Sequence, residues 1–207
     1  MTARFITLEG IEGAGKSTVA KFVLAWLARR QLPGRLTREP GGTPLAERLR
    51  QLVLEPGAES LSPVAETLLM FAARDLHLQG VIRPALARGE WVVCDRFTDA
   101  TRAYQGSGRG VNADLIESLA EAVHGGLAPD CTLLLDLPVS VGLARARGRA
   151  AGSTDRFEAE TSAFFERVRA GYLELARREP RRFQVIDAAA PLERVEAQVE
   201  GVLEDLA

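Results

Sequence analysis

A glycine-rich stretch near the start of the chain has the residue types and spacing of a phosphate-binding loop. Residues 10–17 read Gly-Ile-Glu-Gly-Ala-Gly-Lys-Ser, which fits the pattern GxxxxGK[ST]. Glycines tolerate positive φ and carry no Cβ, so the backbone can wrap closely around a phosphate. Lys16 would add a positive charge at the outer phosphates, and Ser17 would offer an oxygen to Mg²⁺. We therefore expect a nucleoside triphosphate to bind along Gly10, Ile11, Glu12, Gly13, Ala14, Gly15, Lys16, Ser17 and Thr18.

The residues on either side of this loop predict the elements that must position it. An apolar run at 5–8 indicates a buried strand before the loop, and apolar residues at helical spacing, such as Val19, Val23 and Trp26, follow it. A chance glycine turn does not explain strand, spacing and helix together. Only two of the 26 lysines and arginines are lysines, Lys16 and Lys21, and one of them stands where the phosphates would lie.

Four further apolar runs predict strands at 35–37, 91–94, 131–135 and 183–186, with helical patterns between them. This alternation predicts an α/β fold, in which one five-stranded parallel sheet has helices on both faces. The chain shows no long linker or repeat, so residues 1–207 are expected to form a single domain. Ligands bind beyond the carboxyl ends of such strands. The polar residues that end or follow the strands are Arg38, Glu39, Asp95, Arg96, Asp136 and Asp187.

Composition limits the possible partners and compartment. A net charge of −2 gives no reason to expect nucleic-acid binding. No apolar run of about 18 residues predicts a membrane span, and the first residues lack a signal-peptide pattern. Cys94 and Cys131 lie in apolar strand-like runs, which favours two buried thiols over a disulfide or a metal pair. We expect a cytoplasmic protein.

The motifs that accompany the loop favour transfer of a phosphoryl group over its hydrolysis. A guanine-reading Asn-Lys-x-Asp element is excluded, because the only asparagine, Asn112, is followed by Ala-Asp. A motor-type ATPase would have a glutamate after the strand-end aspartate, but Asp95 is followed by Arg96. Arginines at 38, 74 and 96 are predicted at one edge of the sheet and could hold an anionic acceptor bidentately.

The chain resembles the bacterial thymidylate kinase family over nearly its whole length. The matching stretches are LEGIEGAGKST, TREPGGTPLAERLR, LLMFAARDLH, VIRPALARGEWVVCDRF, AYQGSGRG, APDCTLLLDLPVSVGLARAR, DRFE and VIDAAAPLERV. The resemblance implies a P-loop fold like that of nucleoside monophosphate kinases, with a short lid at about 148–156. It implies in-line transfer from ATP-Mg to dTMP, giving ADP and dTDP for dTTP synthesis, and a homodimer.

The resemblance also implies an acceptor site. Phe71 and Arg74 would meet the thymine, by stacking and by hydrogen bonding, and Arg96 would hold the acceptor phosphate. Ala100 stands where the family has a serine, and Thr101 is the candidate to replace that contact. The other residues implied at dTMP are Glu12, Arg38, Glu39, Tyr104, Gln105 and Arg156.

Relatives differ in where the catalytic arginine lies. Eukaryotic-like members carry it directly after the acidic residue of the loop, where this chain has Gly13, and bacterial-like members carry it in the lid. The resemblance therefore implies Arg149 as the main charge stabiliser, with Arg145 and Arg147 as helpers. Together with Lys16 and Arg96, these are the predicted catalytic residues.

The remaining expectations concern the metal, the adenine and the proton. Ser17 is the expected direct ligand of Mg²⁺, Asp95 is expected to act through water, and Glu158 and Glu9 are further candidates. The adenine is expected near Ala188. A phosphate oxygen of dTMP needs no strong base, and His77 and His124 lie in predicted helices away from these motifs. Two alternatives remain: a kinase for another monophosphate on the same fold, and a nucleotide-binding regulatory protein without catalysis.

Overall fold

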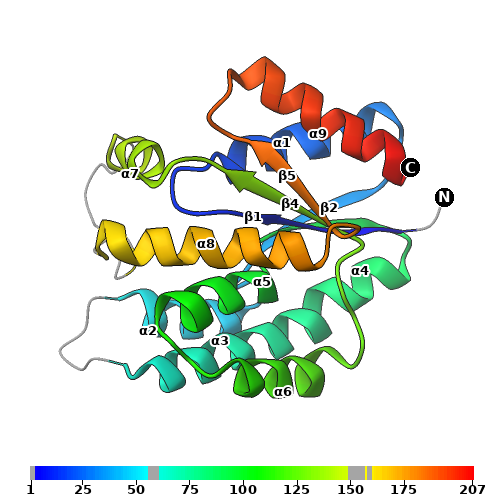
Figure 1. The fold of residues 1–207 in the computed structure, drawn as a ribbon. Coiled ribbons are helices and arrows are strands. Elements are labelled where there is room, and N and C mark those ends of the chain that lie inside the picture. The colour runs from blue at the N-terminus through cyan, green and yellow to red at the C-terminus, as the bar shows by residue number, and fades with distance from the viewer. Residues whose placement is uncertain (1–2, 56–60, 149–156, 158–159) are drawn as a thin grey trace.

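Five parallel strands form one sheet in the order β2-β3-β1-β4-β5 (Figure 1). The computed structural model describes residues 3–55, 61–148, 157 and 160–207. The strands are β1 (Phe5–Glu9), β2 (Gly34–Arg38), β3 (Trp91–Asp95), β4 (Cys131–Asp136) and β5 (Phe183–Asp187). Each predicted strand is confirmed, slightly longer than its apolar run because the polar residue that follows the run still belongs to the ladder.

Helices cover both faces of the sheet, as predicted. On one face lie α1 (Lys16–Arg29) and α9 (Leu192–Leu206); on the other lie α3 (Pro63–His77), α6 (Ala113–His124) and α8 (Ser162–Arg178) (Figure 1). The lower layer of Figure 1 also contains α2 (Pro44–Leu54), α4 (Arg83–Ala87) and α5 (Thr98–Thr101). Helix α7 (Val139–Arg147) follows the end of β4. Within the described part of the chain, no helix is long and apolar enough to cross a membrane.

The three inner strands carry the core. All five residues of β1 and the first four of β3 are buried, and Trp26 of α1 packs on Trp91 with ring centroids 6.1 Å apart. Strand β2 is different, because it forms one edge of the sheet and most of its residues are exposed. Both cysteines are buried and free, as predicted.

Two helical regions depart from regular α geometry. A π-helical segment, η1 (Leu78–Ile82), lies between α3 and α4. Residues 97–111 contain α5 and a second π-helical segment, η2 (Arg102–Gly108). π-Helical turns are uncommon and are frequent at functional sites.

The strand register brings the two strongest motifs together. Leu8 of β1 is paired with Asp95 of β3, and Arg38 of β2 is paired with the same aspartate. The glycine loop after β1, the Asp95-Arg96 pair and the 38–42 loop therefore leave the sheet side by side, at its carboxyl edge.

Candidate active site

One cavity of about 360 Å³ joins the glycine loop to the predicted acceptor residues. Its polar wall contains most of the predicted site residues: Glu12, Gly13, Gly15, Lys16, Ser17, Glu39, Arg74, Asp95, Arg96, Thr101, Tyr104 and Gln105. Residues that the sequence did not single out complete the wall: Pro40, Arg50, Leu54, Met70, Phe97, Ala146 and Phe157. Predicted phosphate and acceptor residues from separate elements of the fold thus line one cavity.

At the phosphate end, Lys16 rests on the loop that it would help to bind. Its Nζ donates to the carbonyl oxygens of Gly10 and Ile11, both at 3.0 Å. Burial of the ammonium, followed by the charge of nearby Arg96, lowers the pKa of Lys16 to about 8. Gly15 precedes the helix with a φ of 93°, a conformation that glycine adopts without strain. The Lys16 ammonium therefore donates to two backbone carbonyls, which phosphate oxygens could replace as acceptors.

Arg96 lies between the loop and the acceptor residues. Its backbone has a φ of 69°, rare outside glycine, which turns the side chain back over the loop. The guanidinium donates to the Gly10 carbonyl at 3.1 Å and to Glu12 Oε1 at 2.9 Å, and it lies 4.7 Å over the Tyr104 ring. The Tyr104 hydroxyl donates to the other oxygen of Glu12, at 2.7 Å. Arg96 and Lys16 therefore share the Gly10 carbonyl.

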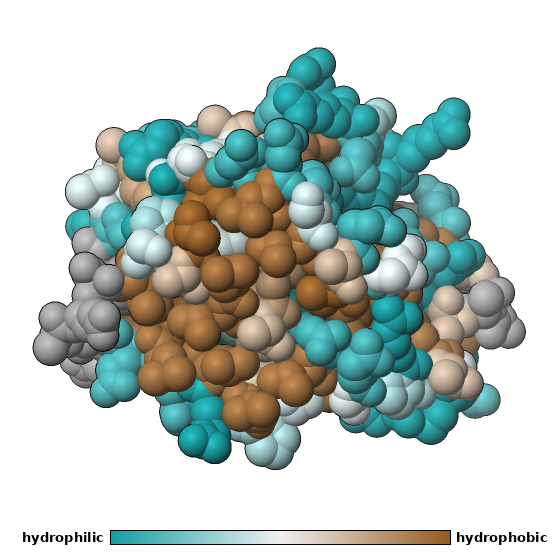
Figure 2. All heavy atoms as spheres, turned by 90° about the horizontal axis from the view of Figure 1, so that it is seen from below, coloured by the Kyte–Doolittle hydropathy of each residue, from teal (hydrophilic) through white to brown (hydrophobic). Residues whose placement is uncertain are grey.

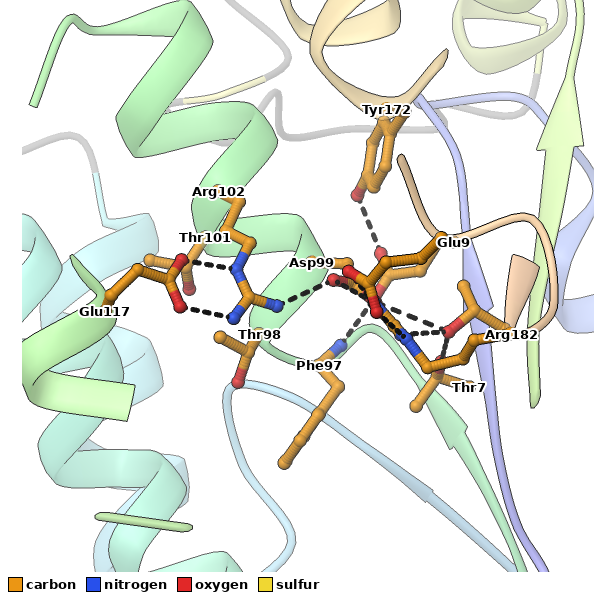
Figure 3. Close-up of polar contacts among 12 residues, drawn as sticks. Thr7, Glu9, Phe97, Thr98, Asp99, Thr101, Arg102, Glu117, Tyr172 and Arg182 are labelled. Atoms are coloured by element: carbon orange, nitrogen blue, oxygen red, sulfur yellow. Dashed lines mark hydrogen bonds and ion pairs between the residues drawn. The ribbon is translucent and has the colours of Figure 1, made fainter. Parts of the chain in front are cut away.

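A buried carboxyl supports the backbone turn that carries Arg96. Glu9 accepts the Phe97 N–H and the Tyr172 hydroxyl, both at 2.7 Å (Figure 3). The Tyr172 oxygen lies 3.3 Å from Arg96. Burial, with the nearby charge of Asp99, raises the pKa of Glu9 to about 8. Glu9 does not line the cavity, so its side chain acts on the site through Phe97 and Tyr172.

Next to Glu9, an ion-pair network fixes α5 to the sheet (Figure 3). Asp99 of α5 accepts from Arg182 at 2.6 and 3.1 Å and from Arg102 at 2.9 Å. Arg102 also binds Glu117 of α6 through two hydrogen bonds of 2.7 Å. Because α5 supplies Thr101 to the cavity wall, this network holds one side of the acceptor site in place.

At the other end of the cavity, Arg74 is held on three sides. Its Nε donates to Glu39 Oε2 at 2.7 Å, and its second terminal nitrogen donates to Thr101 Oγ1 at 3.0 Å and to the Phe97 carbonyl at 3.2 Å. Its first terminal nitrogen is buried and has no hydrogen-bond partner among the described residues. An N–H donor without a partner is thus left in a side chain that lines the cavity.

His77 belongs to this cluster, which corrects the expectation that it lies away from the motifs. Its Nδ1 is 2.9 Å from Glu39 Oε1, and its Nε2 is 2.5 Å from the Thr37 hydroxyl. His124 is also closer than expected, because its ring stacks on Phe97 with centroids 5.0 Å apart. Burial, with the charge of Arg74, lowers the pKa of His124 to about 4. Both histidines support the cavity wall from behind.

The α3 residues that line the cavity are Met70 and Arg74. Phe71 does not line the cavity; it is 2% exposed and packs with Val111 and Ile116 of the core. Neighbouring helix residues point about 100° apart, so a shift by one position exchanges a cavity residue for a core residue. The Phe71 ring was expected to face the site, but the Met70 side chain lines the cavity in its place.

The structure leaves several predicted residues apart from the cavity. The exposed Arg38 side chain pairs with Glu47 at 3.0 Å, outside the cavity wall. Ala188 accepts a hydrogen bond of 2.8 Å from Arg145, which links α7 to the loop after β5. Arg147 is exposed in the last turn of α7. Arg149, Arg156, Glu158 and the lid at 148–156, apart from Gly148, lie outside the described residues.

The residues present fit a magnesium ion. Asp95 Oδ1 is buried without a hydrogen-bond partner among the described residues, and Asp95 and Ser17 line the same cavity. Carboxylate and hydroxyl oxygens are the ligands that Mg²⁺ accepts, usually with several waters. The described residues contain no cluster of three or more histidines, cysteines or acids that could hold a metal alone. Such a sparse donor set suits an ion that is bound mainly through phosphates.

Comparison with known proteins shows the family of the chain. Residues 8–199 match the family model described as thymidylate kinase. The chain belongs to the thymidylate kinase family. It is 57% identical to a thymidylate kinase of Pseudomonas putida strain GB-1, over 98% of this chain and 96% of that one. It is 56% identical to another, from Pseudomonas savastanoi pv. phaseolicola, over 100% and 97%. A crystal structure of thymidylate kinase from Ehrlichia chaffeensis superposes with a TM-score of 0.77 at 33% identity, covering 99% of each chain.

Proposed function

We propose that this member of the thymidylate kinase family transfers the terminal phosphoryl group of ATP to dTMP, giving ADP and dTDP. The observation that carries the proposal is a cavity whose wall contains both Lys16 with the glycine loop and the N–H of Arg74 that has no partner among the described residues. A nucleotide that spanned this distance would place its phosphate between Arg96 and the loop. The relatives' names supply the identity of the acceptor.

The transfer needs charge stabilisation more than proton removal. A phosphate monoester has a second pKa of about 6, so its attacking oxygen is already anionic near neutrality. Two anions must approach, and Lys16 and Arg96 supply the cations within the cavity. For both to bind phosphate oxygens, they must exchange the Gly10 carbonyl for those oxygens. Of the lid arginines, we assign the main charge stabilisation to Arg149, with Arg145 and Arg147 as helpers.

Ser17 and Asp95 would hold Mg²⁺, Ser17 directly and Asp95 through water. The ion supplies Lewis-acid neutralisation of phosphate charge when it is bound. The chain's own contribution is to place a hydroxyl and a carboxylate oxygen beside the phosphate loop, where a hydrated ion can be accommodated.

At the acceptor end, Arg74 would donate to O4 of the thymine, and Met70 would lie on its face. Thioethers make favourable contacts with aromatic rings, and the unbranched side chain of methionine adapts to their shape. Glu39 would act by holding Arg74, and Tyr104 by closing the sugar end together with Glu12. We therefore assign the contact with the thymine face to Met70 and not to Phe71. Arg156 stays a candidate contact of dTMP.

We also propose that the chain forms a homodimer through α3. Figure 2 shows a broad apolar area on the face made by the lower helices of Figure 1. Val64 and Leu68 of α3 are 45% and 47% exposed, and Leu45 and Leu52 of the adjacent α2 are exposed too. Large exposed apolar areas mark protein interaction sites. Sedimentation of the wild type and of Leu68→Glu tests this: a monomeric wild type would contradict it.

The function is tested by ADP release with ATP-Mg and a panel of monophosphates: dTMP, dUMP, dCMP, dGMP and dAMP. We expect a strong preference for dTMP. Comparable rates with another monophosphate would keep the kinase and change its substrate, and no turnover with any of them would favour a regulatory protein. We assign the reaction to the cytoplasm, consistent with the two free cysteines.

A further inference from the structure

Glu66 is a buried carboxylate that contacts the acceptor wall from behind. It lies on α3 one turn before Met70 and is fully buried, but it is not part of the cavity lining. Its Oε1 accepts from Gln105 Nε2 at 2.7 Å and from Arg109 Nε at 2.9 Å. Gln105, on η2, is itself 2% exposed and lines the cavity. Glu66 therefore connects the base-facing helix to a cavity residue from another element.

The charge of Glu66 decides which way the Gln105 amide faces. A carboxylate paired with a guanidinium can accept hydrogen bonds but cannot donate them. The amide nitrogen must then face Glu66, since a reversed amide would bring two acceptor oxygens together in a buried place. No donor among the described residues reaches Gln105 Oε1. The side chain thus keeps an acceptor, and not a donor, for a ligand.

This acceptor complements the donor of Arg74, which lines the same cavity. Arg74 offers an N–H without a partner, and Gln105 offers a carbonyl oxygen. Thymine presents an acceptor at O4 beside a donor at N3–H. Cytosine reverses both positions, with a donor amino group at C4 and an acceptor at N3. If the Arg74 donor and the Gln105 acceptor are both fixed, they can pair with thymine. With cytosine, each of them would face a group of its own kind.

We propose that Glu66 is a positioning residue that fixes the Gln105 amide with its oxygen toward the base, and so excludes cytosine nucleotides from the acceptor site. The inference rests on the proposed function, because it assumes a monophosphate base at Arg74. It assigns rejection of cytosine to a residue that does not touch the substrate.

The test compares kcat/KM for dTMP and for dCMP in the wild type and in Glu66→Met. Methionine fills a similar volume but offers no carboxylate, so Gln105 can turn and present its amino group to cytosine N3. We expect the dTMP-to-dCMP ratio to fall at least tenfold, since a mismatched buried polar pair carries most of such discrimination. Glu66→Gln keeps a carbonyl acceptor and should recover most of the ratio.

Arg109→Lys is the matched control. It disturbs the packing at another partner of the same carboxylate and keeps a positive charge beside it, so Glu66 can still accept from Gln105. The midpoint of thermal unfolding should fall, while the dTMP-to-dCMP ratio stays near the wild-type value. A ratio that collapses equally in Arg109→Lys and Glu66→Met would assign the effect to packing and overturn the proposal.

Two further outcomes keep the proposal separate from the proposed function. A folded Glu66→Met with the wild-type ratio overturns the role of Glu66 alone, whereas a wild type that does not prefer dTMP overturns the function first. If Glu66→Met does not fold, Gln105→Leu decides. That variant must lose the same preference, because its acceptor oxygen is gone, and an unchanged ratio would show that the base never meets Gln105.

Discussion

The two ends of the cavity are built in different ways. At the acceptor end, Arg74 is held by the carboxylate of Glu39, the hydroxyl of Thr101 and a backbone carbonyl, all through buried contacts. At the phosphate end, Lys16 and Arg96 rest on loop carbonyls and on Glu12, which are partners that a phosphate can replace.

The difference separates recognition from catalysis. A base is recognised by donors and acceptors that are already in place, so ordering them costs little when the ligand binds. Phosphate charge is stabilised by cations that begin on weaker acceptors and move to stronger ones. Substitutions at the acceptor end should therefore change which nucleotide is used, and substitutions at the phosphate end should change the rate for every nucleotide.

The largest expected effect tests the phosphate end. Lys16→Ala should lower kcat by about 10²–10³ for all acceptors, because a preorganised cation at the transferring group is lost. The fold should survive, since the change removes a buried charge. Lys21→Ala, at the exposed second lysine of the same helix, is the control and should be unaffected. A Lys16→Ala enzyme with more than a tenth of wild-type turnover would remove the lysine from the mechanism.

A smaller effect is expected at the metal. Asp95→Asn should raise the Mg²⁺ concentration for half-maximal rate about 10–100-fold, the usual cost of altering a group that holds a metal through water. Titration of Mg²⁺ at saturating ATP and dTMP measures it. Asp205→Asn, near the end of α9, should leave the curve unchanged. An unchanged curve in Asp95→Asn would contradict a role of the Asp95 Oδ1 oxygen in holding Mg²⁺.

The acceptor end is tested by a pair of neighbours. Met70→Ala should raise KM for dTMP about tenfold, because loss of roughly 50 Å² of apolar contact costs about 1.3 kcal/mol, with little change in unfolding. Phe71→Ala should lower the free energy of unfolding by about 3–5 kcal/mol, as is usual for a buried ring, and change KM less. The reverse pattern would restore the stacking role of Phe71.

In the wild-type enzyme, the two ends of the cavity should differ in how they respond to alkaline pH. The pKa of Lys16 is about 8 in the folded chain against 10.5 for an ordinary lysine. We expect kcat/KM for ATP to fall about tenfold per unit above pH 8, since kcat/KM reports the free enzyme. The free energy of unfolding should rise between pH 8 and 10.5, where the unfolded chain binds more protons. A flat kcat/KM profile to pH 10 would contradict the buried cation.

The smallest effect on turnover is expected at Glu9. Its pKa is raised from 4.5 to about 8, so the folded chain binds the extra proton between these values, and this contribution to stability is lost as pH rises through them. Glu9→Gln can keep both hydrogen bonds and should flatten that decline, by roughly a few kcal/mol at most, with turnover near the wild-type value. An equally steep decline in the variant would assign it to another group.

The sequence predicted the strands, the glycine loop and the Asp95-Arg96 pair well, because each is a local pattern of period or spacing. Contacts across the fold were not open to that reasoning. Glu39 and Arg74 are 35 positions apart, and only the family resemblance brought them together. His77 looked like one more residue of an apolar helix, although it binds Glu39.

Side-chain direction was the second limit. Met70 and Phe71 are both apolar and adjacent, so composition could not tell which one faces the cavity. Arg38 ends the exposed edge strand and Glu39 follows it, and only Glu39 turns inward. Glu66 gave no indication beyond being an acid in the first turn of a helix, where acids are common for electrostatic reasons alone.

The contact between Gly13 and α7 bears on where the catalytic arginine can lie. A Cβ at Gly13 would overlap the carbonyl oxygen of Gly142, and one at Gly142 would lie 2.7 Å from the Glu12 carbonyl oxygen. The loop position that carries an arginine in eukaryotic-like relatives is closed here by main chain. An arginine at position 13 would require α7 to shift first. The contact between these two glycines therefore supports the proposal that the catalytic arginine comes from outside the loop.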